Sequence, residues 1–320
     1  MGRSRGYLAF VFFLGMAIAI LAQETPVSIK PRLSKGAADR KATIRVDSNL
    51  VLVPVLVTDH HDRLVTGLGR DQFQIFDDKI EQKITQFSTE DAPLSIVLVF
   101  DCSGSMGEKL RRSRMAAAEF LKTANPEDEF ALVTFNDSVK LVSRFGDPPE
   151  DMLNRLGFIE SKGRTALLDA VYLAMNQMRH AKYSRRAILV ISDGGDNSSR
   201  YTEGEVKERA READVQIYSV GIMEPMSARG RTPEELSGAA LLDEISKMTG
   251  GRMYEIDDVD QLPGMAAQLS RALRNQYVLG YSPSGPRDGK MHRIVVKLVR
   301  PEGTPKLRAT FRPSYIAPEE

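Results

Sequence analysis

The segment LSIVLVFDCSGS, residues 94–105, decides how the rest of the chain is interpreted. It begins with a run of mainly apolar residues that is typical of a strand covered on both faces of a sheet. The run ends at Asp101, and Ser103 and Ser105 follow at alternate positions. A buried strand that ends in Asp-x-Ser-x-Ser brings one carboxylate and two hydroxyls to a single point. Gly104 between the serines permits the tight turn that this arrangement needs.

Two more oxygen-bearing side chains occur downstream in comparable settings. Thr165 lies at the start of a predicted helix in GRTALLDA, residues 163–170, and Asp193 ends a second apolar strand in AILVISDGG, residues 187–195. Ligand sites of open α/β sheets lie beyond the carboxyl ends of the strands. Mg²⁺ is a hard cation that prefers oxygen ligands. The sequence therefore predicts one divalent-cation site, formed by Asp101, Ser103, Ser105, Thr165 and Asp193.

Each of these residues also has an ordinary structural explanation. The two aspartates suit turns after strands, and the serines or Thr165 suit the N-cap of a following helix. Taken singly, the ordinary explanation is preferred for every one. Taken together it is not, because the five residues occur in order, each at a strand end or a helix start on the expected edge of one sheet.

The pattern from residue 94 to residue 275 alternates between strands and helices. This alternation predicts a mainly parallel sheet with helices on both faces. The expected strands lie near residues 94–100, 130–135, 187–192, 216–222 and 252–256, with a short antiparallel neighbour at 139–142.

Residues 94–275 resemble a von Willebrand factor type A domain. The Asp101, Ser103, Ser105, Thr165 and Asp193 set is similar to the metal-ion-dependent adhesion site of that family at all five positions. The resemblance implies a Rossmann-like doubly wound sheet of about six strands with one short antiparallel edge. It also implies Mg²⁺ or Mn²⁺ as the cation and the binding of a protein partner through an Asp or Glu carboxylate.

The segments on either side of this domain are β-rich. Residues 43–90 and 277–320 are each too short to bury much surface alone, so we expect their strands to pack together as one antiparallel β region. Pro54 predicts an edge or bulge position in its strand. Asp288 and Gly289 predict a hairpin turn between the strands at 277–281 and 291–299.

The amino-terminal segment has the features of a targeting sequence. Arg3 and Arg5 precede an apolar run, which together predict a secretory signal peptide over residues 1–22, followed by a flexible linker over 23–42. An uncleaved amino-terminal anchor is the alternative. The expected location is periplasmic or secreted, and the layout resembles exported bacterial proteins that carry this domain. Cys102 is the only cysteine, so no intramolecular disulfide forms.

Charge and motif content narrow the functional classes. A formal net charge of +1 argues against nucleic acid as a general partner. The chain has no phosphate-binding G-x-x-x-x-G-K-[ST] loop and no His-Glu-x-x-His pair, and no base neighbours the candidate serines. We therefore expect a non-catalytic protein-binding module that is not an enzyme. A Mg²⁺-dependent hydrolase or phosphoryl-transfer enzyme, and an envelope scaffold with a vestigial metal site, stay open as alternatives.

Basic residues near the expected edge suggest a rim that would attract an acidic partner. They are Lys109, Arg111, Arg112, Arg164, Arg200, Arg229 and Arg231. Ordinary solvated surface arginines are an equally good explanation for each of them.

Overall fold

The computed structural model describes residues 50–89, 91–223, 233–299 and 306–319. The predicted signal peptide and linker, as well as Arg229 and Arg231, lie outside these ranges. Within the described residues, no helix is both long enough and apolar enough to cross a membrane.

A six-stranded sheet forms the centre of the α/β domain. Five of its strands run parallel, and the short edge strand runs antiparallel to its neighbour, as the sequence predicts. In sheet order they are β10 (Met253–Ile256), β9 (Gln216–Ile222), β8 (Arg186–Ser192), β5 (Ser95–Asp101), β6 (Glu129–Phe135) and β7 (Val139–Ser143). Every residue of β5 is buried, because helices cover both faces of the sheet.

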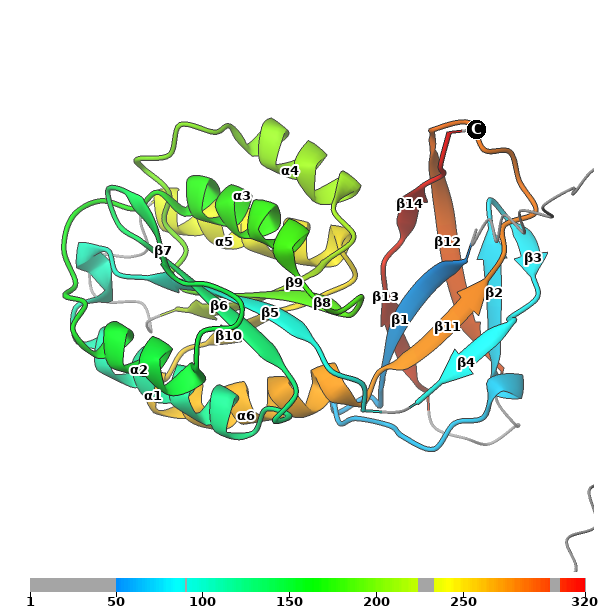
Figure 1. Cartoon of the computed structure of the whole chain (residues 1–320), viewed down its shortest axis with the longest axis horizontal. Helices are drawn as coiled ribbons and strands as arrows, with labels where there is room; N and C mark the ends of the chain where they lie inside the picture. The colour runs from blue at the N-terminus through cyan, green and yellow to red at the C-terminus, as the bar shows by residue number, and fades with distance from the viewer. Residues whose placement is uncertain (1–49, 90, 224–232, 300–305, 320) are drawn as a thin grey trace, which may run out of the picture. The chain divides into compact units, whose positions relative to one another are not determined.

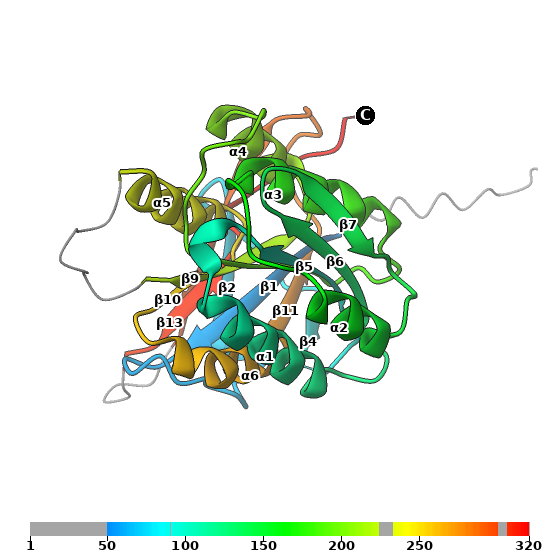
Figure 2. The same cartoon turned by 90° about the vertical axis from the view of Figure 1, so that its left-hand side faces the viewer.

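Helices cover both faces of the sheet (Figures 1 and 2). One core contains side chains of α1 (Lys109–Lys122), α2 (Pro149–Gly157) and α6 (Leu262–Arg274). The other contains side chains of α3 (Leu167–Gln177), α4 (Glu203–Glu212) and α5 (Pro233–Met248). This is the doubly wound α/β arrangement that strand–helix alternation predicts.

Strands from both ends of the described chain form two antiparallel four-stranded sheets. The first contains β13 (Arg308–Phe311), β1 (Val51–Thr58), β11 (Tyr277–Tyr281) and β4 (Gln86–Ser88). The second contains β14 (Ser314–Ile316), β12 (Met291–Leu298), β2 (Phe73–Asp77) and β3 (Ile80–Gln82). One apolar cluster joins residues of both sheets, so the flanking antiparallel β region is present. Short 3-10 turns occupy Arg70–Gln72, Gly104–Met106, Met178–His180 and Val259–Gln261.

Two details of this β region differ from the sequence prediction. The expected hairpin at Asp288 and Gly289 is wrong, because β11 and β12 belong to different sheets and each pairs with strands from the amino-terminal side. Pro54 lies in β1, which is an internal strand. The ladder between β1 and β13 begins only at Val55, so no β13 residue pairs with Pro54. A proline without an N–H is tolerated at such a position.

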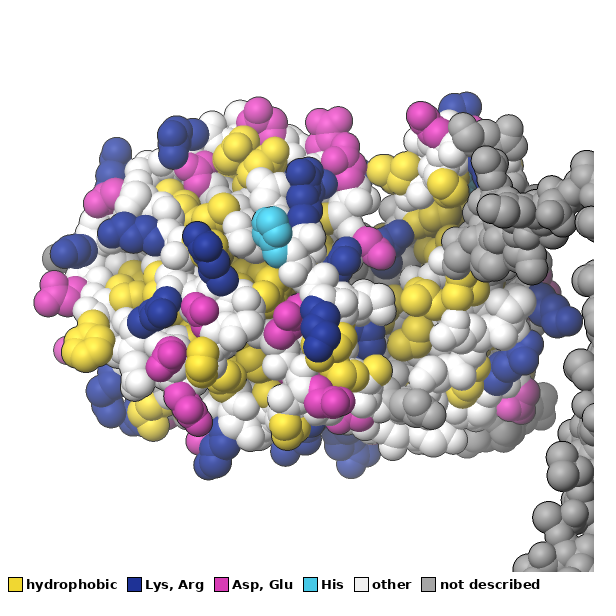
Figure 3. Space-filling view, in the orientation of Figure 1, with side chains coloured by type: hydrophobic (Ala, Val, Ile, Leu, Met, Phe, Trp, Pro, Cys, Tyr) yellow, Lys and Arg dark blue, Asp and Glu magenta, His cyan; other side chains and the backbone are white. Residues whose placement is uncertain are grey.

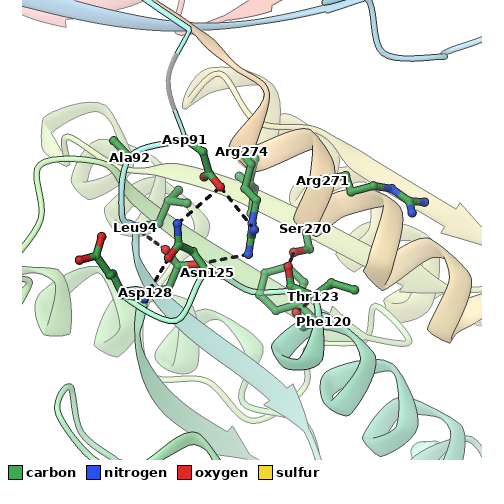
Figure 4. A network of polar contacts seen from close by, with 12 residues as sticks. Asp91, Ala92, Leu94, Phe120, Thr123, Asn125, Asp128, Ser270, Arg271 and Arg274 are labelled. Carbon is green, nitrogen blue, oxygen red and sulfur yellow. Dashed lines mark hydrogen bonds and ion pairs between the residues drawn. The ribbon is translucent and has the colours of Figure 1, made fainter.

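A polar network ties together the segments that enter the α/β domain at the amino ends of β5 and β6 (Figure 4). The carboxylate of Asp128 accepts hydrogen bonds from the backbone N–H groups of Leu94 at 2.8 Å and Asn125 at 2.9 Å. The guanidinium of Arg274, at the end of α6, lies 3.4 Å from a carboxylate oxygen of Asp91 and 3.9 Å from one of Asp128. The network stabilises the strand starts, at the opposite edge from the candidate cation site.

Candidate metal centre

Asp101, Ser103 and Ser105 are joined by hydrogen bonds at the carboxyl end of β5. The carboxylate of Asp101 is fully buried, and it accepts the backbone N–H of Ser103 at 2.8 Å and the hydroxyl of Ser192 at 2.6 Å. The hydroxyl oxygens of Ser103 and Ser105 lie 3.0 Å apart. The structure therefore places one carboxylate and two hydroxyls around one turn, as the Asp-x-Ser-x-Ser pattern predicts.

The loop that precedes α3 is fastened to this turn. The backbone N–H of Gly104 donates to the carbonyl of Gly163 at 3.0 Å, and the hydroxyl of Ser161 donates to the carbonyl of Ser103 at 2.5 Å. A Cβ on Gly104 would lie 3.2 Å from that Gly163 carbonyl oxygen, so glycine allows the close approach of the two loops. Thr165 follows two residues after Gly163 and is 4% exposed.

A third loop, after β8, holds Thr165 from the other side. The side-chain oxygen of Asn197 accepts the backbone N–H of Thr165 at 2.9 Å, and the Thr165 carbonyl accepts the N–H groups of Asn197 and Ser198. Asp196 accepts the N–H groups of Leu167 at 2.8 Å and Leu168 at 3.3 Å at the start of α3. The loop that begins at Asp193 thus binds the segment that carries Thr165.

Asp193 and Asp101 bring two carboxylates into the same buried space. Burial, reinforced by the nearby carboxylate of Asp193, raises the pKa of Asp101 to about 7. Asp193 is 4% exposed, and one of its carboxylate oxygens lies 3.2 Å from the ammonium of Lys109, on the first turn of α1. Two neighbouring buried carboxylates, beside three hydroxyl side chains, suit a small dication that prefers oxygen ligands.

The hydroxyls do not serve as helix caps. Ser103 is the N-cap residue of the turn at Gly104–Met106, but its side chain makes no capping hydrogen bond. The N-cap of α3 is Ala166, and Asp196 supplies the acceptor for the first N–H groups of that helix. The ordinary capping explanation for Ser103 and Thr165 therefore fails, which leaves their oxygens available for a ligand.

Sequence reasoning missed the residues that hold the site together. Ser161, Ser192, Asp196 and Asn197 position its three loops through the hydrogen bonds given above. The only sequence signal was their closeness to the predicted ligands, because polar residues next to a strand end are common in ordinary turns.

Three of the five rim residues in the described ranges form ion pairs with acidic side chains. Lys109 pairs with Asp193, Arg112 with Asp260 at 2.6 Å, and Arg200 with Asp169 at 3.5 Å. Figure 3 shows dark blue and magenta side chains intermixed over one face of the α/β domain. Steering of a partner by this rim stays a hypothesis.

Comparison with known proteins agrees with this fold. The fold and the site define a doubly wound α/β domain with a candidate cation centre at the carboxyl ends of β5 and β8. Residues 96–195 match the family model of the von Willebrand factor type A domain. This chain contains a von Willebrand factor type A domain.

Individual relatives share this part of the chain. An uncharacterized protein of Borreliella burgdorferi is 27% identical over 188 residues, which cover 52% of this chain and 55% of that protein. Calcium-activated chloride channel regulator 1 of Equus caballus is 28% identical over 178 residues, which cover 53% of this chain and 18% of that protein. The chain thus spans about half or less of these relatives.

A solved structure titled von Willebrand factor type A, from Catenulispora acidiphila, has the same fold. It superposes with a TM-score of 0.50 at 13% identity, covering 83% of this chain and 72% of that one. At this level of identity the match establishes the fold alone.

Proposed function

We propose that this protein is a non-catalytic binding module that recognises a protein partner through Mg²⁺ or Mn²⁺. Asp101, Ser103, Ser105, Thr165 and Asp193 would hold the cation, and an Asp or Glu carboxylate of the partner would complete its coordination. The observation that carries the proposal is the pairing of two buried carboxylates with hydroxyls that cap no helix. When bound, the cation supplies positive charge and a coordination position for an external carboxylate.

The chain's own residues prepare the site for this role. Ser192 and the backbone N–H of Ser103 orient the Asp101 carboxylate, and Ser161 fixes the turn that carries the two serines. Asn197 holds the backbone of Thr165 against the same region. Because these contacts already exist without a partner, little ordering is left for the binding step.

The surroundings of the site support a binding role over a catalytic one. Cys102 is buried, and burial raises its pKa to about 12, which keeps it a neutral thiol and a poor nucleophile. His180 lies just beyond the carboxyl end of α3, whereas the site is at the amino end of that helix. His60, His61 and His292 belong to the β region. The hydrolase or phosphoryl-transfer alternative gains no general base from them.

Export and domain layout complete the proposal. Residues 1–22 would direct export and 23–42 would link the signal to the folded chain, with an uncleaved anchor as the alternative outcome. Residues 91–276 would form the von Willebrand factor type A domain, and 43–90 with 277–320 the β region. The strand pairing between β1 and β11, and between β2 and β12, supports joining those two segments.

One observation favours a second candidate, the scaffold with a vestigial site. The ammonium of Lys109 already lies 3.2 Å from Asp193 and can neutralise one of the two carboxylates without any metal. In that case the five residues would be a structural remnant, and the surface of the domain would act without a cation.

Thermal unfolding of the purified chain with Mg²⁺, Mn²⁺ or EDTA tests the main proposal. A cation at 100 times its dissociation constant stabilises the native state by about 2.7 kcal/mol. We expect this shift in the wild type and its loss in the Ser103→Ala/Ser105→Ala variant. An equal melting temperature in Mg²⁺ and EDTA would favour the scaffold. A shift retained in the double variant would place the cation elsewhere.

A further inference from the structure

The β region contains a second cluster of metal-ligating side chains, formed by Asp77, Asp78 and His292. One carboxylate oxygen of each aspartate and a ring nitrogen of the histidine lie within 4.8 Å of one another. Asp77 ends β2, Asp78 follows in the turn to β3, and His292 lies in β12, which pairs with β2. These residues are distant from the type A domain site in the sequence and lie in a different sheet.

Asp77 and His292 occupy positions that the strand pattern reserves for apolar side chains. Inward and outward residues alternate along both strands, and the inward positions of β2 are Phe73, Ile75 and Asp77. His292 precedes Ile294 and Val296 on the inward face of β12. Asp77 is 4% exposed and His292 is 6% exposed. A charged and a titratable side chain at such positions cost free energy unless specific partners satisfy them.

A hydrogen-bonded histidine explains only part of the cluster. One ring nitrogen of His292, Nδ1, lies 2.8 Å from Oδ2 of Asp78, and the other, Nε2, lies 3.1 Å from Oδ1 of Asp288. Oδ1 of Asp77 is buried and has no hydrogen-bond partner, although it faces Nδ1 of His292 from 3.8 Å. This unpartnered oxygen is a second observation, independent of the acidic cluster itself, and it points to a missing ligand between the three groups.

Each of the three side chains is oriented by a partner on its far side. The hydroxyls of Tyr281 and Tyr315 donate to Oδ2 of Asp77 at 3.2 Å and 2.8 Å. The backbone N–H of Arg293 donates to Oδ1 of Asp78 at 2.9 Å.

Asp288 lies behind His292 and can accept a hydrogen bond from Nε2, which leaves Nδ1 directed towards the two aspartates. A carboxylate behind a ligating histidine is a recurrent arrangement in zinc sites. All three inner atoms are therefore aimed at a common point by groups outside it.

We propose that Asp77 Oδ1, Asp78 Oδ2 and His292 Nδ1 form a zinc site in the β region, with Asp288 as its outer partner. Zn²⁺ bonds of about 2.0–2.2 Å place ligand atoms roughly 3.3 Å apart in a tetrahedron, between the 2.8 Å and 3.8 Å contacts observed here. Two carboxylates balance the dication. The side chain of Asp78 is 52% exposed, so a fourth position opens to solvent for a water or an external ligand.

The proposed zinc site is independent of the proposed function of the type A domain. Imidazole favours Zn²⁺ and other transition metals, whereas an all-oxygen set favours Mg²⁺ or Mn²⁺. The two sites therefore differ in metal preference and are separable by choice of metal and of variant.

Zinc titration of the metal-free full chain by calorimetry, with metal content measured after gel filtration, tests this proposal. We expect one Zn²⁺ per chain in the wild type and in the Ser103→Ala/Ser105→Ala variant. His292→Gln and Asp78→Asn should each abolish stoichiometric uptake. Asp288→Asn should weaken zinc binding by about 10–100-fold, because it removes only the outer partner of the histidine.

Two controls keep the result interpretable. His60→Ala/His61→Ala removes an exposed histidine pair that is able to bind zinc adventitiously, and it should leave uptake unchanged. Because Asp78 is largely exposed, Asp78→Asn should fold even if His292→Gln does not, and circular dichroism checks both. The proposal is overturned if the wild type takes up no zinc, if uptake survives Asp78→Asn, or if only the His60→Ala/His61→Ala variant loses it.

Discussion

Replacement of Lys109 by methionine separates the two candidate roles of the type A domain. The Lys109 ammonium lies 3.2 Å from Asp193 Oδ2, and the two side chains are 11% and 4% exposed. Methionine keeps an unbranched apolar stem of similar length but removes the charge. If Lys109 neutralises a carboxylate that a cation also needs, the lysine and the cation compete for it.

The size of this competition follows from the geometry. At an effective dielectric constant of about 20, two unit charges 3.2 Å apart attract by roughly 5 kcal/mol. Desolvation of both groups offsets much of this, and hydrogen bonds to charged groups contribute about 1.5–3 kcal/mol net. Removal of the lysine should therefore destabilise the metal-free chain by that amount. It should raise the apparent affinity for Mg²⁺ by about 10–100-fold.

Calorimetric titration with Mg²⁺ and urea denaturation in EDTA measure the two effects separately. Lys122→Met is the matched control on the same helix, because Lys122 is 75% exposed and forms an exposed ion pair with Glu119. It should change neither quantity appreciably. A Lys109→Met chain that binds Mg²⁺ no more tightly than the wild type would refute the competition. Absence of binding in both chains would support the scaffold.

Three further predictions concern the pH response and the stability of the domain. In EDTA, the free energy of unfolding should fall as pH rises from about 4 towards 7, because the native state holds the Asp101 proton more tightly than the unfolded chain. Mg²⁺ or the Asp101→Asn substitution should flatten this pH profile. A flat profile in EDTA would contradict the prediction. Asp128→Asn turns an amide donor towards one of the two N–H groups that the carboxylate accepts, because each bonds to a different carboxylate oxygen. Urea denaturation should show a loss of about 1–3 kcal/mol in the free energy of unfolding, and an unchanged midpoint would count against the network. Gly238→Ala should lower the stability of the folded chain by about 1–3 kcal/mol or more, because its Cβ would lie 1.2 Å from the Gly194 carbonyl oxygen. The control Gly264→Ala in α6 would place its Cβ where nothing lies within 4 Å, so it should be neutral or stabilising. Equal effects of the two substitutions would refute this packing.

The α/β domain was accessible from sequence because its signals are local. The apolar strands at Ser95–Asp101 and Arg186–Ser192, and the helical spacing between them, appear within short windows of the chain. Parallel strands with helical crossovers must place their carboxyl ends at one edge, so the motif residues could be assigned to one site before any contact was known. The loop residues Asp196 and Asn197 escaped because a polar residue after a strand predicts a turn without saying which backbone groups it will bind.

The β region shows the limit of such reasoning. Asp288 and Gly289 predicted a local hairpin, but strand pairing is decided by which apolar faces fit together across the two sheets. The inward faces of β1, β2, β11 and β12 share one apolar cluster, with β1 and β11 in one sheet and β2 and β12 in the other. A turn-favouring dipeptide contributes too little free energy to override that burial.

By itself the sequence determined the class of the central domain, the Asp-x-Ser-x-Ser turn and the order of the five candidate ligands. Those features depend on residue type and on spacing over a few positions. Only the tertiary structure decided that Lys109 lies against Asp193. It also decided that Asp78 contacts His292 and accepts a hydrogen bond from Arg293, although more than 200 residues separate Asp78 from these partners. Such contacts arise when sheets and helices pack to bury apolar surface, and no local pattern in the chain encodes which distant side chains that packing brings together.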